Sequence, residues 1–287
     1  MNRVNLFIKN LMKQACRNSY YSTQTGNPVL VEFEDGVKNI ILSDEKTRNA
    51  LSIVMMKSLI DNIRKEEHNP ELRCIVIGAN GKVFSAGHNL KELSSEKDIE
   101  THKEVFSLAF QLMNAIIDSP VPVIAKVNGV AAAAGCQLVA QCDLSICSRQ
   151  SSFLTPGVNF GIFCSTPGVA LSRKLHQSTT LKMLLTGRSI SADEAKTAGL
   201  ITEVCDENEL DQIVTSYCDD IKKKSREVLS LGKRFYYEQL NLGIKEAYRT
   251  GRDVMVENLQ LRDGREGVDS FIQKRKAIWK HGITESI

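Results

Sequence analysis

Two short stretches of small residues are the strongest candidates for a functional site in this sequence. They are FSAGHNL (Phe84–Leu90) and NGVAAAAGCQLVAQCDL (Asn128–Leu144). Each follows an apolar run that is typical of a strand, and the second leads into a helical pattern, so each turn is expected to present free backbone N–H groups. Two N–H groups that point at one place form an oxyanion hole, which stabilises negative charge developing on a carbonyl oxygen.

The elements around these stretches alternate between strands and helices. Residues 29–34 and 37–42 alternate in polarity on either side of Asp35-Gly36, which predicts a hairpin. Residues 52–67 have the apolar spacing of a helix that begins at a serine cap, and residues 74–79 predict a buried strand. This order indicates a strand, a helix and a strand that lead to the first turn.

A second unit of the same kind follows. We expect a helix over 99–118, a break at the prolines after it, a strand over 123–127 that leads into the second turn, and a strand over 143–148. From about residue 225 the pattern is almost wholly helical. The sequence therefore predicts an α/β protein with a core of repeated ββα units over 24–224 and a C-terminal helical module over 225–287.

The N-terminus has the composition of a mitochondrial transit peptide. The first acidic residue is Glu32, and the residues before it combine a basic amphipathic helical pattern with a hydroxyl-rich stretch at 19–23. We therefore expect residues 1–23 to be a transit peptide that is cleaved in the region 18–24. The alternative is an amphipathic helix that stays in the mature protein and binds a surface.

Charge and cysteine usage exclude several classes of function. Removal of residues 1–23 lowers the formal net charge from +3 to −1, so the sequence predicts no nucleic-acid partner. No apolar run approaches the ~20 residues that a membrane-spanning helix needs. The eight cysteines show neither a CxxC pair nor a metal-ligand spacing, so we expect reduced thiols, no metal site and no disulfide.

Five segments of the chain follow one another in the order of a known family. They are NALS (49–52), IVIGANGKVFSAGHNLKEL (75–93), the block 128–144, TGRSISADEAKTAGLITEV (186–204) and EGVDSFIQKRK (266–276). Together they resemble the crotonase (enoyl-CoA hydratase/isomerase) family over nearly all of the mature length. One segment alone would be a weak signal, whereas five in the same order are specific. Within the family, the sequences FSAGHNLKEL and FCSTPGVALSR most resemble a mitochondrial group of hydratase-like proteins.

The resemblance implies a fold, a ligand and a pair of donors. The family's fold is a spiral of ββα units that assembles as a homotrimer or a hexamer, with the last helices closing the ligand site. Its ligands are acyl-CoA or enoyl-CoA thioesters, so coenzyme A is part of the substrate and no separate cofactor is expected. The implied oxyanion-hole donors are the N–H groups of His88 and Ala134, and a helix N-terminus at Ala134 favours negative charge there.

The resemblance also implies where coenzyme A would bind. Lys82, Ala86 and Lys91 lie in or beside the first turn, and we expect Lys274 to lie in the terminal helix, with Phe271 one turn before it. The lysines would contact the phosphates and adenine, and the phenylalanine would pack near the adenine from a neighbouring subunit. The alternatives are solvated surface lysines and an ordinary core aromatic residue.

Both catalytic acids of the family's hydratases are missing. Gln137 stands at the first position and Gly157 at the second. An amide does not transfer protons near neutral pH, and glycine has no side chain. Each missing acid or base commonly costs roughly 10²- to 10⁴-fold in rate, so efficient hydration by the usual route is not expected.

Other side chains near these positions are candidates for replacement chemistry. His88 titrates near neutrality and is the first of them, although its side chain could instead face solvent. Cys164 fits a buried structural thiol better than a nucleophile, and Ser165 and Thr166 follow it. Asp143 falls between a helix and a strand, away from the acid positions, and is expected to be architectural.

We therefore expect a protein of the mitochondrial matrix that binds an acyl-CoA or enoyl-CoA thioester in fatty-acid metabolism. Its activity would be hydratase-like but weak or altered, and the sequence does not decide whether it is an enzyme. One alternative is a non-catalytic acyl-CoA-binding or regulatory protein. The other is a different enolate reaction, such as decarboxylation or thioester hydrolysis.

Overall fold

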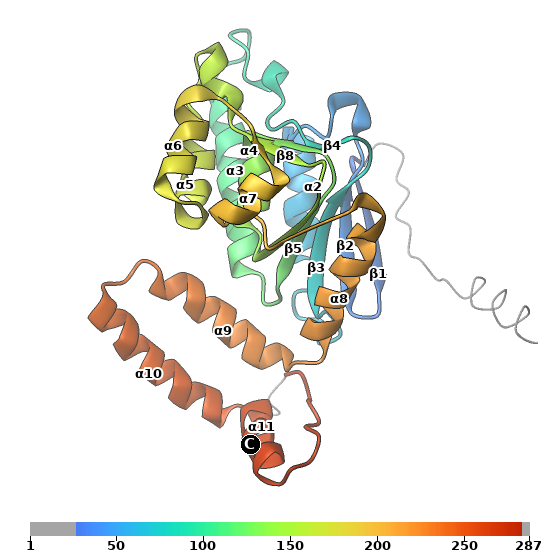
Figure 1. Ribbon diagram of the computed structural model, residues 1–287, viewed down its shortest axis with the longest axis vertical. Coiled ribbons are helices and arrows are strands. Elements are labelled where there is room, and N and C mark those ends of the chain that lie inside the picture. Colours follow the sequence, from blue (N-terminus) through green and yellow to red (C-terminus); the bar gives the residue numbers. More distant parts are fainter. Residues whose placement is uncertain (1–26, 283–287) are drawn as a thin grey trace, which may run out of the picture.

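Two β-sheets form the centre of the protein, with helices around them (Figure 1). The computed structural model describes residues 27–282, so the expected transit peptide over 1–23 lies outside the described residues. The six-stranded sheet has the order β1 (Val29–Glu34), β2 (Val37–Leu42), β3 (Cys74–Ala79), β5 (Val123–Val127), β7 (Leu144–Ser148) and β10 (Glu203–Cys205). The four-stranded sheet has the order β4 (Val83–Ser85), β6 (Val130–Ala132), β8 (Ser152–Leu154) and β9 (Ile190–Ser191).

Ten α-helices lie among the described residues. In the core they are α2 (Ile53–Arg64), α3 (Ile99–Asp118), α4 (Ala134–Gln141), α5 (Ser165–Lys174), α6 (Gln177–Thr186), α7 (Ala192–Ala198) and α8 (Leu210–Lys222). The C-terminal helices are α9 (Arg226–Gln239), α10 (Ile244–Gln260) and α11 (Arg262–Ile272). Short 3₁₀ turns lie at Glu45–Thr47, Leu90–Glu92, Pro156–Phe160 and Glu207–Glu209. No helix within 27–282 is both long and apolar enough to cross a membrane.

The long elements confirm the sequence predictions. β1 and β2 form the antiparallel hairpin, and the rest of the larger sheet is parallel. The Ser52 hydroxyl accepts the N–H of Met55 at 3.2 Å and so begins α2. The Asp98 carboxylate accepts the N–H of Thr101 at 2.7 Å and begins α3. Both side chains satisfy a donor that the first helical turn leaves unpaired.

The smaller sheet differs from the sequence prediction. We expected the two small-residue turns to follow β3 and β5 directly, whereas the short strands β4 and β6 stand between them. β4 pairs with β6, and β6 pairs with β8, all in parallel. Each of the three strands has only three residues, which is too short for an alternating pattern to be recognised. Their pairing brings the two turns together.

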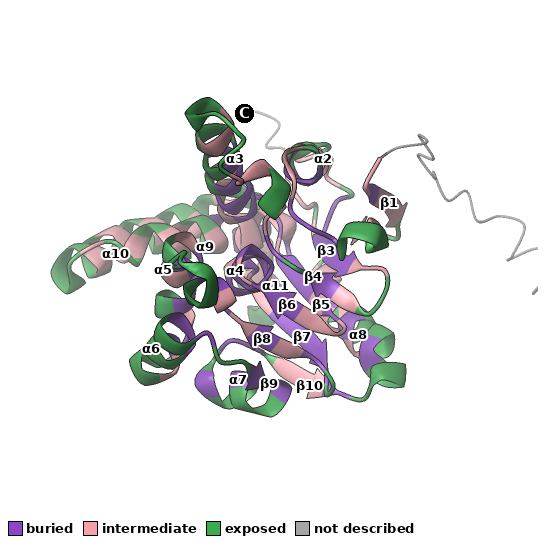
Figure 2. Ribbon diagram, turned by 90° about the horizontal axis from the view of Figure 1, so that it is seen from above, coloured by how far each residue is buried: buried purple, intermediate pink, exposed green. Residues whose placement is uncertain are grey.

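The main hydrophobic core surrounds α4. Every residue of α4 except Gln141 is buried, and Figure 2 shows this helix beside the buried strands at the centre of the protein. Leu138 and Val139 are fully buried in the same cluster as residues of α2 and α3. A helix that is buried on all sides is held rigidly by packing. α4 can therefore present its first turn at a fixed position.

Helices α9 to α11 form a module that projects from the core (Figure 1). α10 buries none of its seventeen residues. Its exposed apolar side chains are Ile244, Tyr248, Met255, Val256 and Leu259. An apolar surface of this kind on one helix typically marks a contact with another protein chain.

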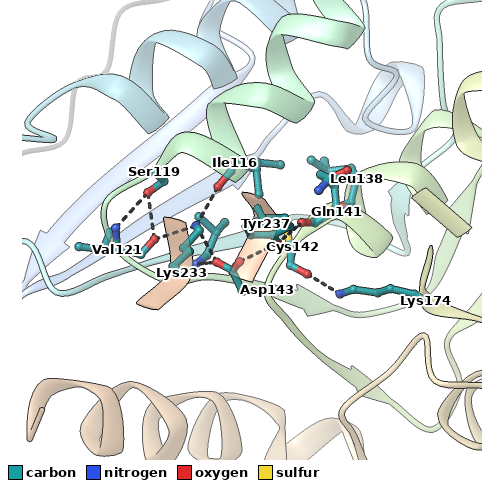
Figure 3. Close-up of polar contacts among 11 residues, drawn as sticks. Ile116, Ser119, Val121, Leu138, Gln141, Cys142, Asp143, Lys174, Lys233 and Tyr237 are labelled. Atoms are coloured by element: carbon teal, nitrogen blue, oxygen red, sulfur yellow. Dashed lines mark hydrogen bonds and ion pairs between the residues drawn. The ribbon is translucent and has the colours of Figure 1, made fainter. Parts of the chain in front are cut away.

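A cluster of polar side chains links α9 to the core (Figure 3). The Lys233 ammonium group lies 2.8 Å from the Asp143 carboxylate, and the Tyr237 hydroxyl donates to the same carboxylate at 2.8 Å. The N–H of Val123 also donates to Asp143, at 2.7 Å. Burial, with the carboxylate beside it, raises the pKa of Tyr237, so this phenol stays protonated as a donor. Asp143 therefore has an architectural role, as the sequence indicated.

Replacing Tyr237 with phenylalanine is expected to lower the free energy of unfolding by about 1.5–3 kcal/mol, the usual range for a hydrogen bond to a charged group. Tyr236 is the matched control, because it lies on the same helix with 56% of its surface exposed. Tyr236→Phe should change stability by less than about 0.5 kcal/mol. Urea unfolding of both variants measures the difference, and equal losses would contradict the role given to the cluster.

Candidate functional site

The two small-residue turns meet at the N-terminus of α4. A Cβ atom built on Gly87 would lie 2.9 Å from the carbonyl oxygen of Ala132 and 3.2 Å from the amide nitrogen of Ala134. Gly87 also has a φ of +87°, which side chains disfavour. Only glycine therefore lets the backbone before His88 lie directly against the first N–H of α4.

The N–H groups of His88 and Ala134 are unpaired within residues 27–282. Ala134 is the first residue of α4, so its N–H has no acceptor inside the helix. The N–H of His88 has no backbone acceptor among these residues, whereas the carbonyl oxygen of its neighbour Gly87 accepts the N–H of Leu51 at 2.8 Å. The positive end of the α4 dipole lies at the same place. Two unpaired donors on adjoining segments can bind one oxygen atom that carries partial negative charge.

A strained residue precedes the second donor. Ala133 has φ 48° and ψ −116°, and its N–H donates to the carbonyl oxygen of Leu154 at 2.9 Å. Ala133, and not Ala134, thus has the positive φ that favours glycine. Non-glycine residues in such conformations cost of order 1–3 kcal/mol and are found mainly at functional sites. The strain fixes the direction in which α4 begins.

Replacing Ala133 with glycine is expected to raise the free energy of unfolding by about 1 kcal/mol, because relief of the strain exceeds the entropic cost of glycine. Ala140 is a suitable comparison, since it lies inside α4 and is 2% exposed. Ala140→Gly should lower stability by about 1 kcal/mol or more. Denaturant unfolding measures the change in the free energy of unfolding of both variants. A loss of stability in Ala133→Gly would show that Ala133 is not strained.

Gln137 and Gly157, where the family resemblance implies acids in the hydratases, differ in the space around them. Gln137 is 5% exposed, and its side-chain Oε1 has no hydrogen-bond partner within the described part of the chain. A Cβ atom on Gly157 would lie 2.3 Å from the carbonyl oxygen of Ile162 and 2.8 Å from the Sγ of Cys164. A side chain at 157 would therefore require that segment to move. Position 137 can accommodate a glutamate, whereas position 157 cannot.

The His88 side chain is a neutral base. Its Nδ1 lies 3.4 Å from the carbonyl oxygen of Leu51, and its ring meets the Phe106 ring edge-on with 5.5 Å between centroids. A carbonyl oxygen only accepts, so the proton is assigned to Nδ1 and Nε2 carries the lone pair. Burial lowers the pKa of His88. Nε2 is itself buried and has no partner among the described residues, so it can accept a hydrogen bond or a proton.

The other candidates for replacement chemistry are not activated. Burial raises the pKa of Cys164, which keeps its thiol protonated and weakly nucleophilic. The Ser165 hydroxyl is exposed and donates to the carbonyl oxygen of Phe163 at 3.4 Å. Thr166 is half-buried one position further along α5. The structure supports a structural role for Cys164 and no serine nucleophile.

Sequence reasoning missed Thr155. This residue is 0% exposed, and its hydroxyl has no partner within residues 27–282. It precedes the 3₁₀ turn that contains Gly157, yet its side chain makes no capping hydrogen bond. A buried polar group without a partner costs about 1–3 kcal/mol. A lone threonine before a proline gives no sequence signal for such a position.

The residues expected to contact coenzyme A fall into two separate groups. Lys82, Ala86 and Lys91 are exposed around the first turn. Phe271 is 83% exposed on α11, which lies at the far end of the protein from β4 (Figure 1). Lys274 lies just past the end of α11, with a φ of 54°, and not within the terminal helix as we expected. One chain does not bring the two groups together.

A cavity of about 660 Å³ lies at the opposite end of α4 from the N–H groups of His88 and Ala134, which we call the amide pair. Gln141 and Asp143 line it together with residues of α5 and α9. Asp143 and Lys233, which line it, pair with each other, and Lys174 donates to the carbonyl oxygen of Cys142 (Figure 3). The cavity is therefore separate from the N–H groups of His88 and Ala134, and none of the buried polar atoms that lack a partner within residues 27–282 lies in its lining.

Comparisons with known proteins identify the family of the chain. Residues 32–282 match the family model described as enoyl-CoA hydratase/isomerase. The chain is 51% identical to the human protein named "Enoyl-CoA hydratase domain-containing protein 3, mitochondrial" over 86% of this chain and 82% of that protein. The zebrafish protein of the same name is 45% identical over 91% of this chain and 90% of that protein.

Solved structures show the same similarity. The crystal structure of human enoyl coenzyme A hydratase domain-containing protein 3 superposes with a TM-score of 0.86 at 49% identity, covering 88% of this chain and 100% of that chain. An enoyl-CoA hydratase structure from Mycobacterium smegmatis has a TM-score of 0.85 at 38% identity, covering 88% of this chain and 98% of that chain. The chain therefore belongs to the enoyl-CoA hydratase/isomerase, or crotonase, family.

Proposed function

We propose that the protein binds an acyl-CoA or enoyl-CoA thioester and polarises its carbonyl group with the N–H groups of His88 and Ala134. The observation that carries this proposal is the contact between Gly87 and the start of α4, beside two N–H groups that have no acceptor among the described residues. A thioester oxygen between them gains negative charge as the α-carbon becomes enolate-like. One such donor is typically worth about 3–4 kcal/mol of transition-state stabilisation.

Hydration by the usual route is slow in this proposal. Gln137 occupies the position of one acid, and an amide neither gives nor takes a proton near neutral pH. Gly157 occupies the other, where the backbone of Ile162 excludes a side chain. The two losses together favour a thioester-binding protein over an efficient hydratase. A regulatory acyl-CoA binder is therefore the second candidate function.

The proposed location is the mitochondrial matrix, where the protein would act in fatty-acid metabolism. Its similar relatives from human and zebrafish carry "mitochondrial" in their names. The basic, acid-free stretch over residues 1–23 is the segment that would direct import and then be removed. N-terminal sequencing of the protein from mitochondria tests this, and a mature chain that still begins at Met1 would contradict it.

We propose a homotrimer or a hexamer as the working assembly. α10 buries none of its residues, and its apolar side chains would be covered by a neighbouring subunit. The same assembly would bring Phe271 and Lys274 of one subunit to the coenzyme A site of another. Sedimentation equilibrium of the full chain measures the mass, and a monomer at micromolar concentration would contradict the proposal.

Calorimetry with butyryl-CoA tests the central proposal, with free coenzyme A as the control. We expect binding of the thioester, and tighter binding than that of coenzyme A alone. Loss of the enoyl absorbance of crotonyl-CoA would reveal hydration, and release of free thiol would reveal thioester hydrolysis. Consumption of a malonyl-type thioester would reveal decarboxylation. Absence of binding at millimolar concentrations of the thioester would contradict the proposal.

A further inference from the structure

Polar contacts hold the segment that follows α11 against the rest of the protein. This segment, residues 273–282, is called the clasp segment, and it returns to the junction between α8 and α9 (Figure 1). The Trp279 indole N–H donates to the carbonyl oxygen of Lys223 at 2.8 Å. The backbone N–H of His281 donates to the buried Asp263 carboxylate at 3.0 Å. The clasp segment is therefore fixed near its end as well as at α11.

A side-chain contact between His281 and Arg73 joins the clasp segment to the start of β3. The Nη1 of Arg73 lies 3.0 Å from the Nε2 of His281. An arginine side chain only donates hydrogen bonds, so Nε2 carries a lone pair and the proton of the neutral ring is assigned to Nδ1. A protonated ring would instead present an N–H group to the guanidinium group. The contact therefore exists only while His281 is neutral.

Charged groups of three parts of the fold surround His281 and its neighbour Gly282. They are Arg73 and Glu71 before β3, Arg226 and Glu227 at the start of α9, and Asp263 on α11. The two arginines disfavour a proton on the His281 ring, and the carboxylates of Asp263 and Glu71 favour one. Burial, followed by the charge of Arg73, outweighs the carboxylates and lowers the pKa of His281.

The contact leaves two buried donors without acceptors. The Nε of Arg73 and the Nδ1 of His281 have no hydrogen-bond partner among the described residues. A buried donor without an acceptor destabilises the structure that contains it, whereas water would satisfy both groups if the segment moved away. The closed position of the clasp segment is therefore opposed by its own unpaired donors.

We propose that protonation of His281 releases the clasp segment from Arg73, so that the C-terminus of the protein opens as the pH falls. The released segment binds a proton at the ordinary pKa of histidine, about 6.5, whereas the closed segment resists the proton. The ratio of open to closed segment should therefore rise by up to about tenfold for each pH unit below about 6.5. Above that pH the clasp segment stays closed.

Release of the clasp segment would also free Lys274, which belongs to it. A residue proposed to contact coenzyme A would then lose its fixed position at the end of α11. The opening itself would occur whether or not a thioester binds. Its absence would therefore leave the proposed function intact, and a failure to bind thioesters would leave the clasp intact.

The fluorescence of Trp279 tests release, because this residue is the single tryptophan of the chain and lies in the clasp segment. We expect its emission to shift to longer wavelength between about pH 7.5 and about pH 5.5, on either side of the ordinary pKa of histidine. His281→Gln should abolish the shift, because its Oε1 accepts from Arg73 but does not titrate. The control is His176→Gln, the same change at an exposed histidine, which should keep the shift.

Hydrogen exchange detects opening even where the open population is small. After correction for the intrinsic exchange rate, protection of the backbone N–H of residue 281 should fall severalfold over the same pH range. It should stay constant in His281→Gln. Unchanged emission and protection in the parent would overturn the inference, as would a pH response that persists in His281→Gln or is lost in His176→Gln. A parallel loss of far-ultraviolet circular dichroism would also overturn it, because the whole fold would then respond.

Discussion

Replacing Ala134 with proline is expected to lower any turnover of an enoyl thioester by about 10²- to 10³-fold, the usual effect of losing one oxyanion-hole donor. Proline removes the N–H, which has no acceptor within the helix at this first position. The absorbance of a bound chromophoric enoyl thioester should also lose its shift to longer wavelength. This second readout does not depend on the rate of turnover.

Ala192 provides the matched control for this variant. It is the first residue of α7, it is buried, and the Ser191 side chain caps that helix. Ala192→Pro removes an equivalent N–H away from the amide pair. We expect it to retain both the turnover and the absorbance shift. If Ala192→Pro and Ala134→Pro lose the shift equally, the N–H of Ala134 has no special role.

Replacing Gln137 with glutamate is expected to raise the rate of enoyl-CoA hydration by roughly 10²-fold, the lower end of the range for a positioned acid or base. Glutamate has nearly the same size as glutamine, so the buried site can hold it. Burial raises the pKa of a carboxyl group. The ionised form is the base, so the rate should increase as the pH rises through that raised pKa.

Gln141→Glu is the control, because it adds the same charge at the last residue of α4, away from the amide pair. It should leave hydration at the parent level. Position 157 is not a useful second site, since a Cβ there lies 2.3 Å from the carbonyl oxygen of Ile162. If Gln137→Glu is no faster than the parent, the absence of a carboxylate at position 137 does not limit hydration, which would contradict the proposal.

The long elements could be predicted because their patterns repeat several times. α3 begins and ends at the expected residues, Ile99 and Asp118, since five turns of apolar spacing follow a capping aspartate. The hairpin over 29–42 has alternation on both sides of Asp35-Gly36. In both cases local sequence preference and burial favour the same structure, so one sequence suffices.

The smaller sheet and the strain near the site could not be predicted in this way. β4, β6 and β8 exist because they pair with one another across long stretches of sequence. Ala133 has a positive φ, and its N–H donates to the carbonyl oxygen of Leu154. An alanine in the sequence does not predict a positive φ. The Thr155 hydroxyl is buried without a hydrogen-bond partner among the described residues only as a result of tertiary folding, so the sequence does not reveal it. These features depend on tertiary contacts that local patterns do not contain.

A crystal structure of the full chain with a bound saturated acyl-CoA would show where the thioester oxygen binds. We expect this oxygen to lie about 2.7–3.2 Å from the amide nitrogens of both His88 and Ala134. A bound thioester whose carbonyl oxygen points away from these two nitrogens, with both N–H groups still unpaired, would contradict it.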